Sequence, residues 1–303
     1  MEDQGVNGEI WNKQATELLN RFGWNTIGDH DIDIKGSDKK KFGIDTLMTF
    51  KTPLKAMPQS VILEAKRYKT SSFQDTMLQA WIKRLDEKLV ALRDSSDLFE
   101  MFPSLEDCTA FDVGVIVIWF SDTDAYKDFR PKFISALQKV NVSWRERKAG
   151  RSSIFVMDNT RILRLCALEK TMKELGDGFA FCYSPAYQDG KMEENSKMLT
   201  IEYMFSDVIL GNVEKDGQVE PVVFYFGEDN TKSFCMLKSA LSRSSIWKRG
   251  RKLHLFLYES DVDIRKITPT IKDLFDGIEK IEIKFMDTSN ELPSYLKNII
   301  TNE

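Results

Sequence analysis

The sequence predicts an α/β fold, with a mixed central sheet flanked by helices and a second α/β domain after it. Three observations predict it. Segments with apolar residues at helical spacing interleave with alternating or continuously apolar segments along all 303 residues. The run from Val113 to Phe120 is apolar throughout, as in a strand covered on both faces. A composition of 42% hydrophobic and 30% charged residues is typical of a folded chain.

The first domain is expected to start with a helix over 8–22, whose apolar residues form one stripe and which Gly23 ends. Two strands follow over 42–50 and 60–68, and the prolines between them predict a hairpin. An amphipathic helix is expected over 78–92. After the apolar run, the last elements of this domain are a helix over 126–140 and a strand over 154–157.

A second series of helices and strands follows, so we expect domains at 1–160 and 161–303. The first element of this series is a helix over 162–175, which Gly176-Asp177-Gly178 ends. We expect the second domain to serve regulation, dimerisation or partner binding. Its remaining elements follow from the same periodicities: strands over 199–210, 222–226, 253–258 and 280–285, and helices over 234–241 and 268–275.

Charge is distributed unevenly along the chain. The formal net charge is -4, but residues 34–93 hold 13 Lys or Arg against 6 Asp or Glu. Such a basic stretch suits either a phosphate backbone or a solvated surface. The sequence has no apolar run near the ~18 residues of a membrane helix, and its first residues are polar and acidic, so we expect a cytoplasmic protein without membrane contact.

Histidine and cysteine are scarce in this chain. Its two histidines and four cysteines show no paired spacing, which excludes zinc ribbons, zinc fingers and histidine-metal nucleases. A metal site would therefore have to be built from carboxylates.

One group of charged residues follows the pattern of a metal-dependent hydrolase. Asp45 ends the segment Phe-Gly-Ile-Asp, and Glu64 and Lys66 lie two residues apart in the next predicted strand, so the latter two point to one face. If the two strands pair, Asp45 converges on the same point. Two carboxylates supply oxygen ligands for Mg²⁺, with Mn²⁺ as an alternative, and the lysine can orient water or stabilise developing negative charge.

These residues resemble the motif of the PD-(D/E)XK nuclease superfamily, which has the restriction-endonuclease-like fold. The resemblance covers residues 8–158, where helix, hairpin with Asp and then Glu-x-Lys, helix and strand follow one another in the family's order. It implies that Asp45 and Glu64 bind metal and that Lys66 assists the attacking water, while Ile44 replaces the proline of the family name. It also implies an effector subunit of a bacterial anti-phage defence system.

The first helix lacks the glutamate that many members of this superfamily carry there. Helical geometry places Asn12, with Gln14, at the margin of the buried stripe, whereas Glu9 faces away and has a basic partner four residues on. We therefore expect Asn12 to complete the site, with Glu9 as the alternative. Gln79 lies 13 residues after Lys66 and is expected to assist, as a glutamine does in some members.

Two other groups of acidic residues are weaker candidates. Asp263, Glu282 and Lys284 repeat the separation of Asp45 from the Glu-x-Lys motif, but a predicted helix lies between them, and a charged strand face is the preferred interpretation. Three aspartates within 29–33 could supply a second metal, although an exposed strand or acidic loop is favoured.

The sequence thus predicts a Mg²⁺-dependent DNA endonuclease that acts on double-stranded DNA with a protein partner subunit, and a homodimer is a further option. Two alternatives stay open: a catalytically silent nucleic-acid-binding or scaffold subunit, and a ribonuclease that uses the same site. The residues expected to bind phosphates are Lys39, Lys40, Lys41, Lys51, Lys55, Arg67, Lys69, Lys248, Arg249 and Arg251.

Overall fold

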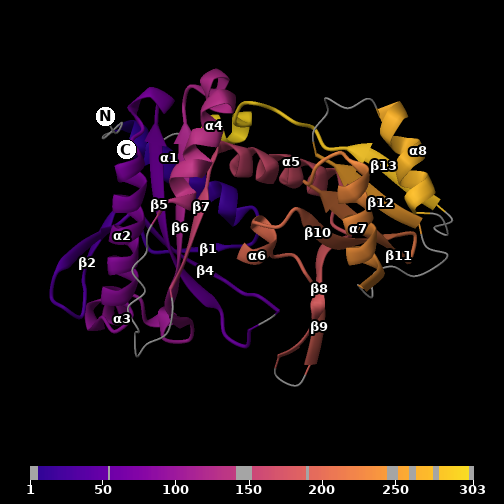
Figure 1. The fold of residues 1–303 in the computed structure, drawn as a ribbon. Helices are drawn as coiled ribbons and strands as arrows, with labels where there is room; N and C mark the ends of the chain where they lie inside the picture. Colours follow the sequence, from indigo (N-terminus) through magenta and orange to yellow (C-terminus); the bar gives the residue numbers. More distant parts are fainter. Residues whose placement is uncertain are drawn as a thin grey trace. The chain divides into compact units, whose positions relative to one another are not determined.

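The computed structural model describes residues 6–53, 55–140, 152–188, 191–243, 252–258, 264–275 and 280–299, and Figure 1 shows its fold. None of the helices within these ranges is long and apolar enough to span a membrane. The chain divides into two compact units. The first unit contains Met1–Lys51, Met57–Ile162 and Asn290–Glu303, and the second contains Thr52–Ala56 and Leu163–Ser289. The segment from Asn290 therefore groups with the first unit.

The first unit is built on a five-stranded mixed sheet. Its main elements are α1 (Val6–Asn20), β1 (Asn25–Ile27), β2 (Ile32–Lys35), β3 (Lys41–Ile44), β4 (Thr46–Phe50), β5 (Gln59–Tyr68), α2 (Asp75–Leu92), α3 (Ser96–Met101), β6 (Thr109–Phe120), α4 (Thr123–Gln138) and β7 (Ser153–Met157). The strand order is β1-β4-β5-β6-β7. β1, β4 and β5 pair antiparallel, whereas β5, β6 and β7 pair parallel, so the predicted mixed sheet is confirmed.

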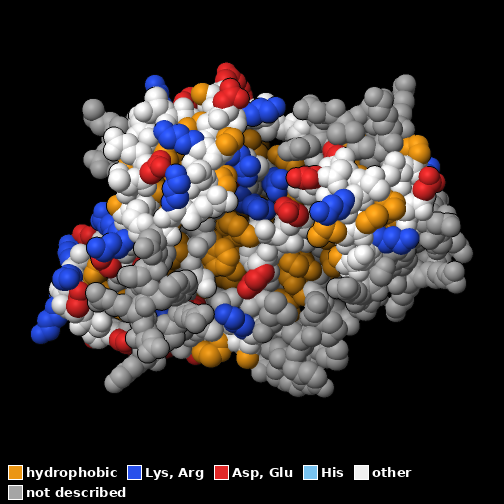
Figure 2. All heavy atoms as spheres, in the orientation of Figure 1, with side chains coloured by type: hydrophobic (Ala, Val, Ile, Leu, Met, Phe, Trp, Pro, Cys, Tyr) orange, Lys and Arg blue, Asp and Glu red, His pale blue; other side chains and the backbone are white. Residues whose placement is uncertain are grey.

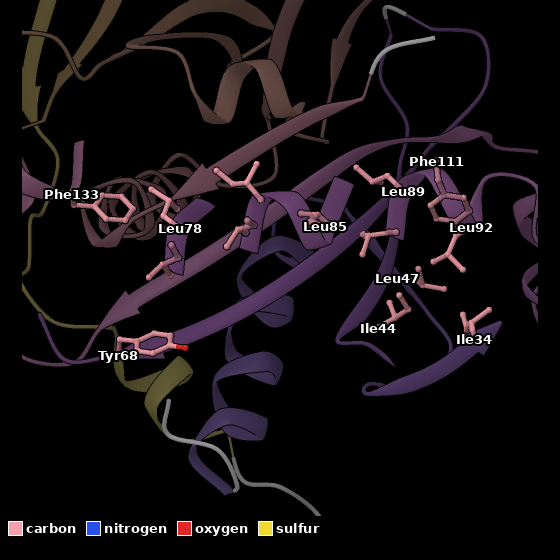
Figure 3. Close-up of a cluster of buried hydrophobic side chains, with 14 of the residues drawn as sticks. Ile34, Ile44, Leu47, Tyr68, Leu78, Leu85, Leu89, Leu92, Phe111 and Phe133 are labelled. Atoms are coloured by element: carbon pink, nitrogen blue, oxygen red, sulfur yellow. The ribbon is translucent and has the colours of Figure 1, made fainter. Parts of the chain in front are cut away.

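Helices cover both faces of this sheet. Leu78 and Leu85 of α2, with residues of α4, pack on one face in a cluster of buried apolar side chains (Figure 3). α1 covers the other face, where Trp11 Nε1 donates to the Val117 carbonyl oxygen at 3.1 Å and the Trp11 ring lies 5.8 Å from the ring of Trp119. The part of β6 from Val113 to Phe120 can be apolar throughout because both of its faces are covered.

The predicted strand over 42–50 is two strands in the structure. β3 pairs with β2 in a separate two-stranded sheet, whereas β4 pairs with β1 and β5, and Asp45 is the residue between them. The prediction of one continuous strand was wrong because extended, apolar character continues while the pairing partner changes. The hairpin with the strand over 60–68 is confirmed for β4 and β5.

A short C-terminal helix, α9 (Ser294–Lys297), belongs to the first unit. Leu296 of this helix is fully buried, and Gln14 Nε2 of α1 donates to its carbonyl oxygen at 2.6 Å. The Arg21 guanidinium lies 4.2 Å from the ring centroid of Tyr295. Gln14 therefore holds α9 against α1. The two helices are far apart in the sequence, since Gln14 and Leu296 are separated by 282 positions.

The second unit is built on a six-stranded sheet. Its elements are the main part of α5 (Asn159–Leu175), β8 (Phe179–Gln188), β9 (Lys191–Ser196), α6 (Ile201–Met204), β10 (Val208–Lys215), β11 (Gln218–Tyr225), α7 (Thr231–Arg243), β12 (Lys252–Leu257), α8 (Ile264–Leu274) and β13 (Lys280–Phe285). The order is β13-β12-β11-β10-β8-β9, with β11, β12 and β13 parallel. Phe234 and Leu237 of α7 and Ile271 of α8 share one buried cluster with these strands.

The predicted strand over 199–210 was wrong in its position. Residues 201–204 form α6, and β10 begins at Val208 and runs on to a turn at Asp216 and Gly217. Both turn residues have positive φ, 52° and 72°, as a two-residue type I′ hairpin requires. The turn thus sets the end of β10 later than apolar character alone suggests.

Candidate active site

Asp45 lies where the chain passes from β3 to β4, and its carboxylate is held against β5. Asp45 Oδ2 accepts a hydrogen bond from the Ala65 backbone N–H at 2.9 Å and another from Lys66 Nζ at 3.3 Å. The last pair of the β4–β5 ladder is Thr46 with Leu63, so the Ala65 N–H lies beyond the ladder. The carboxylate therefore takes the place of a main-chain acceptor, which fixes its direction.

Glu64 lies on β5, on the same side as Ile62, which belongs to the cluster that α2 covers. Glu64 is 6% exposed. Its Oε2 accepts a hydrogen bond from Lys66 Nζ at 3.2 Å, and the same nitrogen contacts Asp45. The structure thus brings Asp45, Glu64 and Lys66 together: Asp45, at the junction of β3 and β4, and Glu64 of β5 both contact one ammonium group.

A second lysine, which the motif did not reveal, completes this cluster. Lys88 of α2 is 1% exposed, and its Nζ forms an ion pair with Glu64 Oε1. Lys88 lies one turn from Leu85 and Leu92, within the apolar stripe of α2. A lysine at a stripe position that should be apolar is the sequence signal that could have found it.

Asn12 contacts the backbone of Asp45 rather than its carboxylate. Asn12 Nδ2 donates to the Asp45 carbonyl oxygen at 2.9 Å and to Asp31 Oδ1 at 3.3 Å, and Asn12 Oδ1 accepts from the Thr46 hydroxyl at 2.8 Å. Both ends of the amide thus hold the segment around Asp45. Glu9, the alternative, is exposed and pairs with a lysine four residues on, at 3.2 Å.

Asp31 lies beside Asp45. Its backbone N–H donates to the Asp45 carbonyl oxygen at 3.0 Å, and its φ of 56° is uncommon for a residue other than glycine. Partial burial of its carboxyl raises the pKa of Asp31, and the negative charge of Asp45 raises it further. One of the three aspartates within 29–33 is therefore a neighbour of the site, whereas Asp33 pairs with Lys41 on the exposed hairpin at 2.8 Å.

A comparison with protein families decides what the first unit is. The family model described as the GAPS4 protein PD-(D/E)XK nuclease domain matches residues 1–161. The chain belongs to this family. Asp45, Glu64, Lys66 and Lys88 all lie within the matched residues. No curated protein matches the chain. A nuclease domain of this family implies a nucleic-acid substrate, and PD-(D/E)XK nucleases typically use divalent metals.

The carboxylates of this PD-(D/E)XK nuclease domain fit a divalent cation. Lys66 Nζ lies between Asp45 and Glu64, so this is the point at which the two acids already stabilise positive charge. Mg²⁺ in proteins is commonly held by one or two carboxylates together with water. Among the described residues, no group of three or more His, Cys, Asp or Glu is arranged to hold a metal. The fit is that of a two-carboxylate site.

The basic residues predicted to bind phosphates lie on several different segments of the chain. Lys40 and Lys41 lie on the exposed β2–β3 hairpin and pair with Asp38 at 3.5 Å and Asp33 at 2.8 Å, and Figure 2 shows basic and acidic side chains interspersed there. Lys248, Arg249 and Arg251 lie outside the described residues. Of the other predicted residues, Lys39, Lys51, Lys55 and Lys69 are exposed, and Arg67 and Gln79 are half-buried.

The weaker candidate in the second unit is part of a charged network between strands. Asp263 lies outside the described residues, but Glu282 of β13 contacts Lys252 at 2.6 Å, Lys284 at 2.8 Å and His254 at 3.2 Å. The hydrogen bond from Lys252, and then that from Lys284, lowers the pKa of Glu282 to about 2. These contacts favour the interpretation of a charged strand face.

Proposed function

We propose that this chain is a Mg²⁺-dependent endonuclease that hydrolyses DNA phosphodiester bonds. One observation carries the proposal: Asp45, which directly precedes β4, and Glu64 of the neighbouring β5 both contact Lys66 Nζ, at 3.3 and 3.2 Å, inside a PD-(D/E)XK nuclease domain. Two carboxylates beside a lysine suit metal-assisted hydrolysis of a phosphodiester, since the acids can hold the cation and the lysine can stabilise developing negative charge.

Each residue of the cluster has a role in this proposal. Asp45 and Glu64 would hold the divalent cation, which supplies Lewis-acid activation of the phosphate and of water when bound. Lys66 would orient the attacking water or stabilise the negative charge that develops on the phosphate. Asn12 would act through the Asp45 backbone, by keeping the carboxylate directed toward β5, and Gln79 stays a predicted assisting residue. The exposed lysines of the β2–β3 hairpin would contact phosphates.

Cleavage of supercoiled plasmid DNA in Mg²⁺ tests these roles. The site variants are Asp45→Asn and Lys66→Met, and matched controls are Asp287→Asn and Lys170→Met, which alter an exposed ion pair of the second unit. We expect each site variant to lose at least about 100-fold in cleavage rate, as when a charge-stabilising group is removed from an active site. The controls should cut like the wild type. Equal cutting by all five proteins would remove Asp45 and Lys66 from the mechanism.

DNA-binding measurements without a divalent cation, and cleavage assays with RNA, separate the two alternative functions. DNA binding that weakens with salt, needs no divalent cation and is not followed by cleavage is the behaviour of a silent nucleic-acid-binding subunit. Cleavage of RNA but not DNA, lost in Asp45→Asn, is the behaviour of a ribonuclease that uses the same site.

We also propose that the chain is an effector subunit in anti-phage defence, controlled by a protein partner. The proposal follows from the resemblance to defence nucleases. Phage plaque counts on bacteria that carry the wild type or Asp45→Asn, each with its neighbouring genes, test it: protection should require the aspartate. Light scattering of the purified chain measures its molar mass in solution and so tests the homodimer. The second domain's predicted role in regulation, dimerisation or partner binding can be tested with the same samples.

A further inference from the structure

Lys88 is a buried cation that the proposed chemistry does not use. Its side chain is 1% exposed and lies among Leu85, Leu89 and Leu92 of α2, which are also fully buried. Lysine is almost never buried to this extent unless it is paired. Its described partner is Glu64, whose side chain is 8% exposed.

The contacts of Glu64 show what Lys88 does to the charge balance of the site. Glu64 Oε1 pairs with Lys88, and Glu64 Oε2 pairs with Lys66 at 3.2 Å, which also contacts Asp45. The two ammonium groups thus balance the formal charges of Asp45 and Glu64 without any metal ion. A buried carboxylate left without a partner is strongly destabilising, so the lysines allow Asp45 and Glu64 to stay close together in the metal-free fold.

The same contacts set up a competition at Glu64. A divalent cation held by this carboxylate would lie close to the Lys88 ammonium. The two cations would then compete for the same two oxygen atoms, Oε1 and Oε2 of Glu64. Lys66 lies on the partly exposed edge of the cluster, 13% exposed, whereas the 1% exposed Lys88 is enclosed by α2 and the sheet. The Lys88 ammonium is therefore shielded from solvent, unlike that of Lys66.

We propose that Lys88 is a built-in counterion of Glu64, which stabilises the metal-free nuclease domain and weakens its affinity for divalent cations. The inference rests on the proposed function, because it takes Asp45 and Glu64 as the residues that hold the cation. Lys88 is a positioning residue: it acts through Glu64 and sets the cation concentration at which the site fills.

Two measurements on the full-length chain test the proposal, with Lys88→Met as the main variant, since methionine keeps the volume of the lysine stem. In EDTA, Lys88→Met should unfold at a lower urea concentration than the wild type, because Glu64 loses a partner. By calorimetry with MnCl₂ alone, it should bind Mn²⁺ about tenfold more tightly, or about 1.4 kcal/mol. Lys170→Met, a control at an exposed lysine, should leave both values unchanged.

A double variant keeps the proposal testable if Lys88→Met fails to fold. Glu64→Gln combined with Lys88→Met removes both charges of the buried pair, so it should be more stable in EDTA than Glu64→Gln alone. A double variant as unstable as the sum of the single losses would overturn the counterion role. Lys88→Arg, which keeps the charge, should keep the Mn²⁺ affinity of the wild type if it folds.

The outcomes separate this inference from the proposed function. Mn²⁺ binding by the wild type with unchanged or weaker binding by Lys88→Met overturns the competition, because a purely structural lysine, or one that positions Glu64 for the cation, gives that result. If neither protein binds Mn²⁺, the proposed metal site fails and the competition fails with it. The stability of the double variant then still decides whether Lys88 and Glu64 are a coupled pair.

Discussion

Leu296→Ala should destabilise the nuclease domain, although Leu296 lies far beyond the last matched residue, 161. Its side chain is fully buried in the first unit, and its carbonyl oxygen accepts the Gln14 Nε2 hydrogen bond. Truncation of a fully buried leucine costs about 2–5 kcal/mol, from lost burial and from the cavity that remains. α9 is short and can relax toward the space, so we expect about 2–3 kcal/mol, a large fraction of the about 5–15 kcal/mol of a typical domain.

Urea unfolding followed by tryptophan fluorescence measures this loss, because Trp11, Trp24 and Trp119 are buried in the first unit. Lys297→Ala is the matched control. Lys297 is 47% exposed and pairs with an exposed glutamate, so its loss should change stability by no more than about 0.5 kcal/mol. Equal unfolding midpoints for Leu296→Ala and Lys297→Ala would refute the packing of α9 on α1. A fragment of residues 1–162 should be less stable than the full chain by at least the Leu296 cost.

Two further substitutions test packing and charge. A Cβ added at Gly114 of β6 would lie 2.7 Å from Leu85 Cδ2, so Gly114→Ala should lower the free energy of unfolding by about 1–3 kcal/mol through overpacking, and the double variant with Leu85→Ala should lose less than the sum of the single losses in urea. The pKa of Glu282 is about 2 in the folded chain against an ordinary 4.5, so its stabilising effect is complete above pH 4.5 and is lost as the pH falls toward 2. Because the side chain is 33% exposed, solvent screening reduces that effect to about 1 kcal/mol. Glu282→Gln should remove it at pH 7 and flatten the fall in stability between these pH values, measured by circular dichroism; a pH profile equal to that of the wild type would contradict the assignment.

The elements of the first unit could largely be predicted because their periodicity is local. Helical spacing marks α2, and the continuous apolar run marks β6. The change of partner at Asp45 could not be predicted, since residues 42–50 are extended on both sides of it and only long-range pairing distinguishes β3 from β4. α6 did have a local signal: Thr200 caps it, with its hydroxyl accepting from the Tyr203 N–H at 3.4 Å.

The candidate site likewise contains residues that a local motif predicts and residues that only long-range contacts bring in. Asp45, Glu64 and Lys66 follow a motif in the sequence, and pairing of two neighbouring strands is enough to bring them together. Lys88 comes from a helix that approaches the sheet only in the folded chain, and its partner lies 24 positions earlier. Asp31 reaches Asp45 through a left-handed backbone conformation, which no periodicity indicates.

The return of the chain to its first unit has a consequence for biosynthesis. All five strands of the nuclease sheet are translated before the segment Leu163–Ser289 of the second unit, whereas α9 is translated after it. At about 5–20 residues per second, translation of the second unit takes on the order of ten seconds. Throughout that interval the nascent first unit lacks α9, the helix that packs on α1. Folding of the first unit can therefore be completed only after the second unit has been translated.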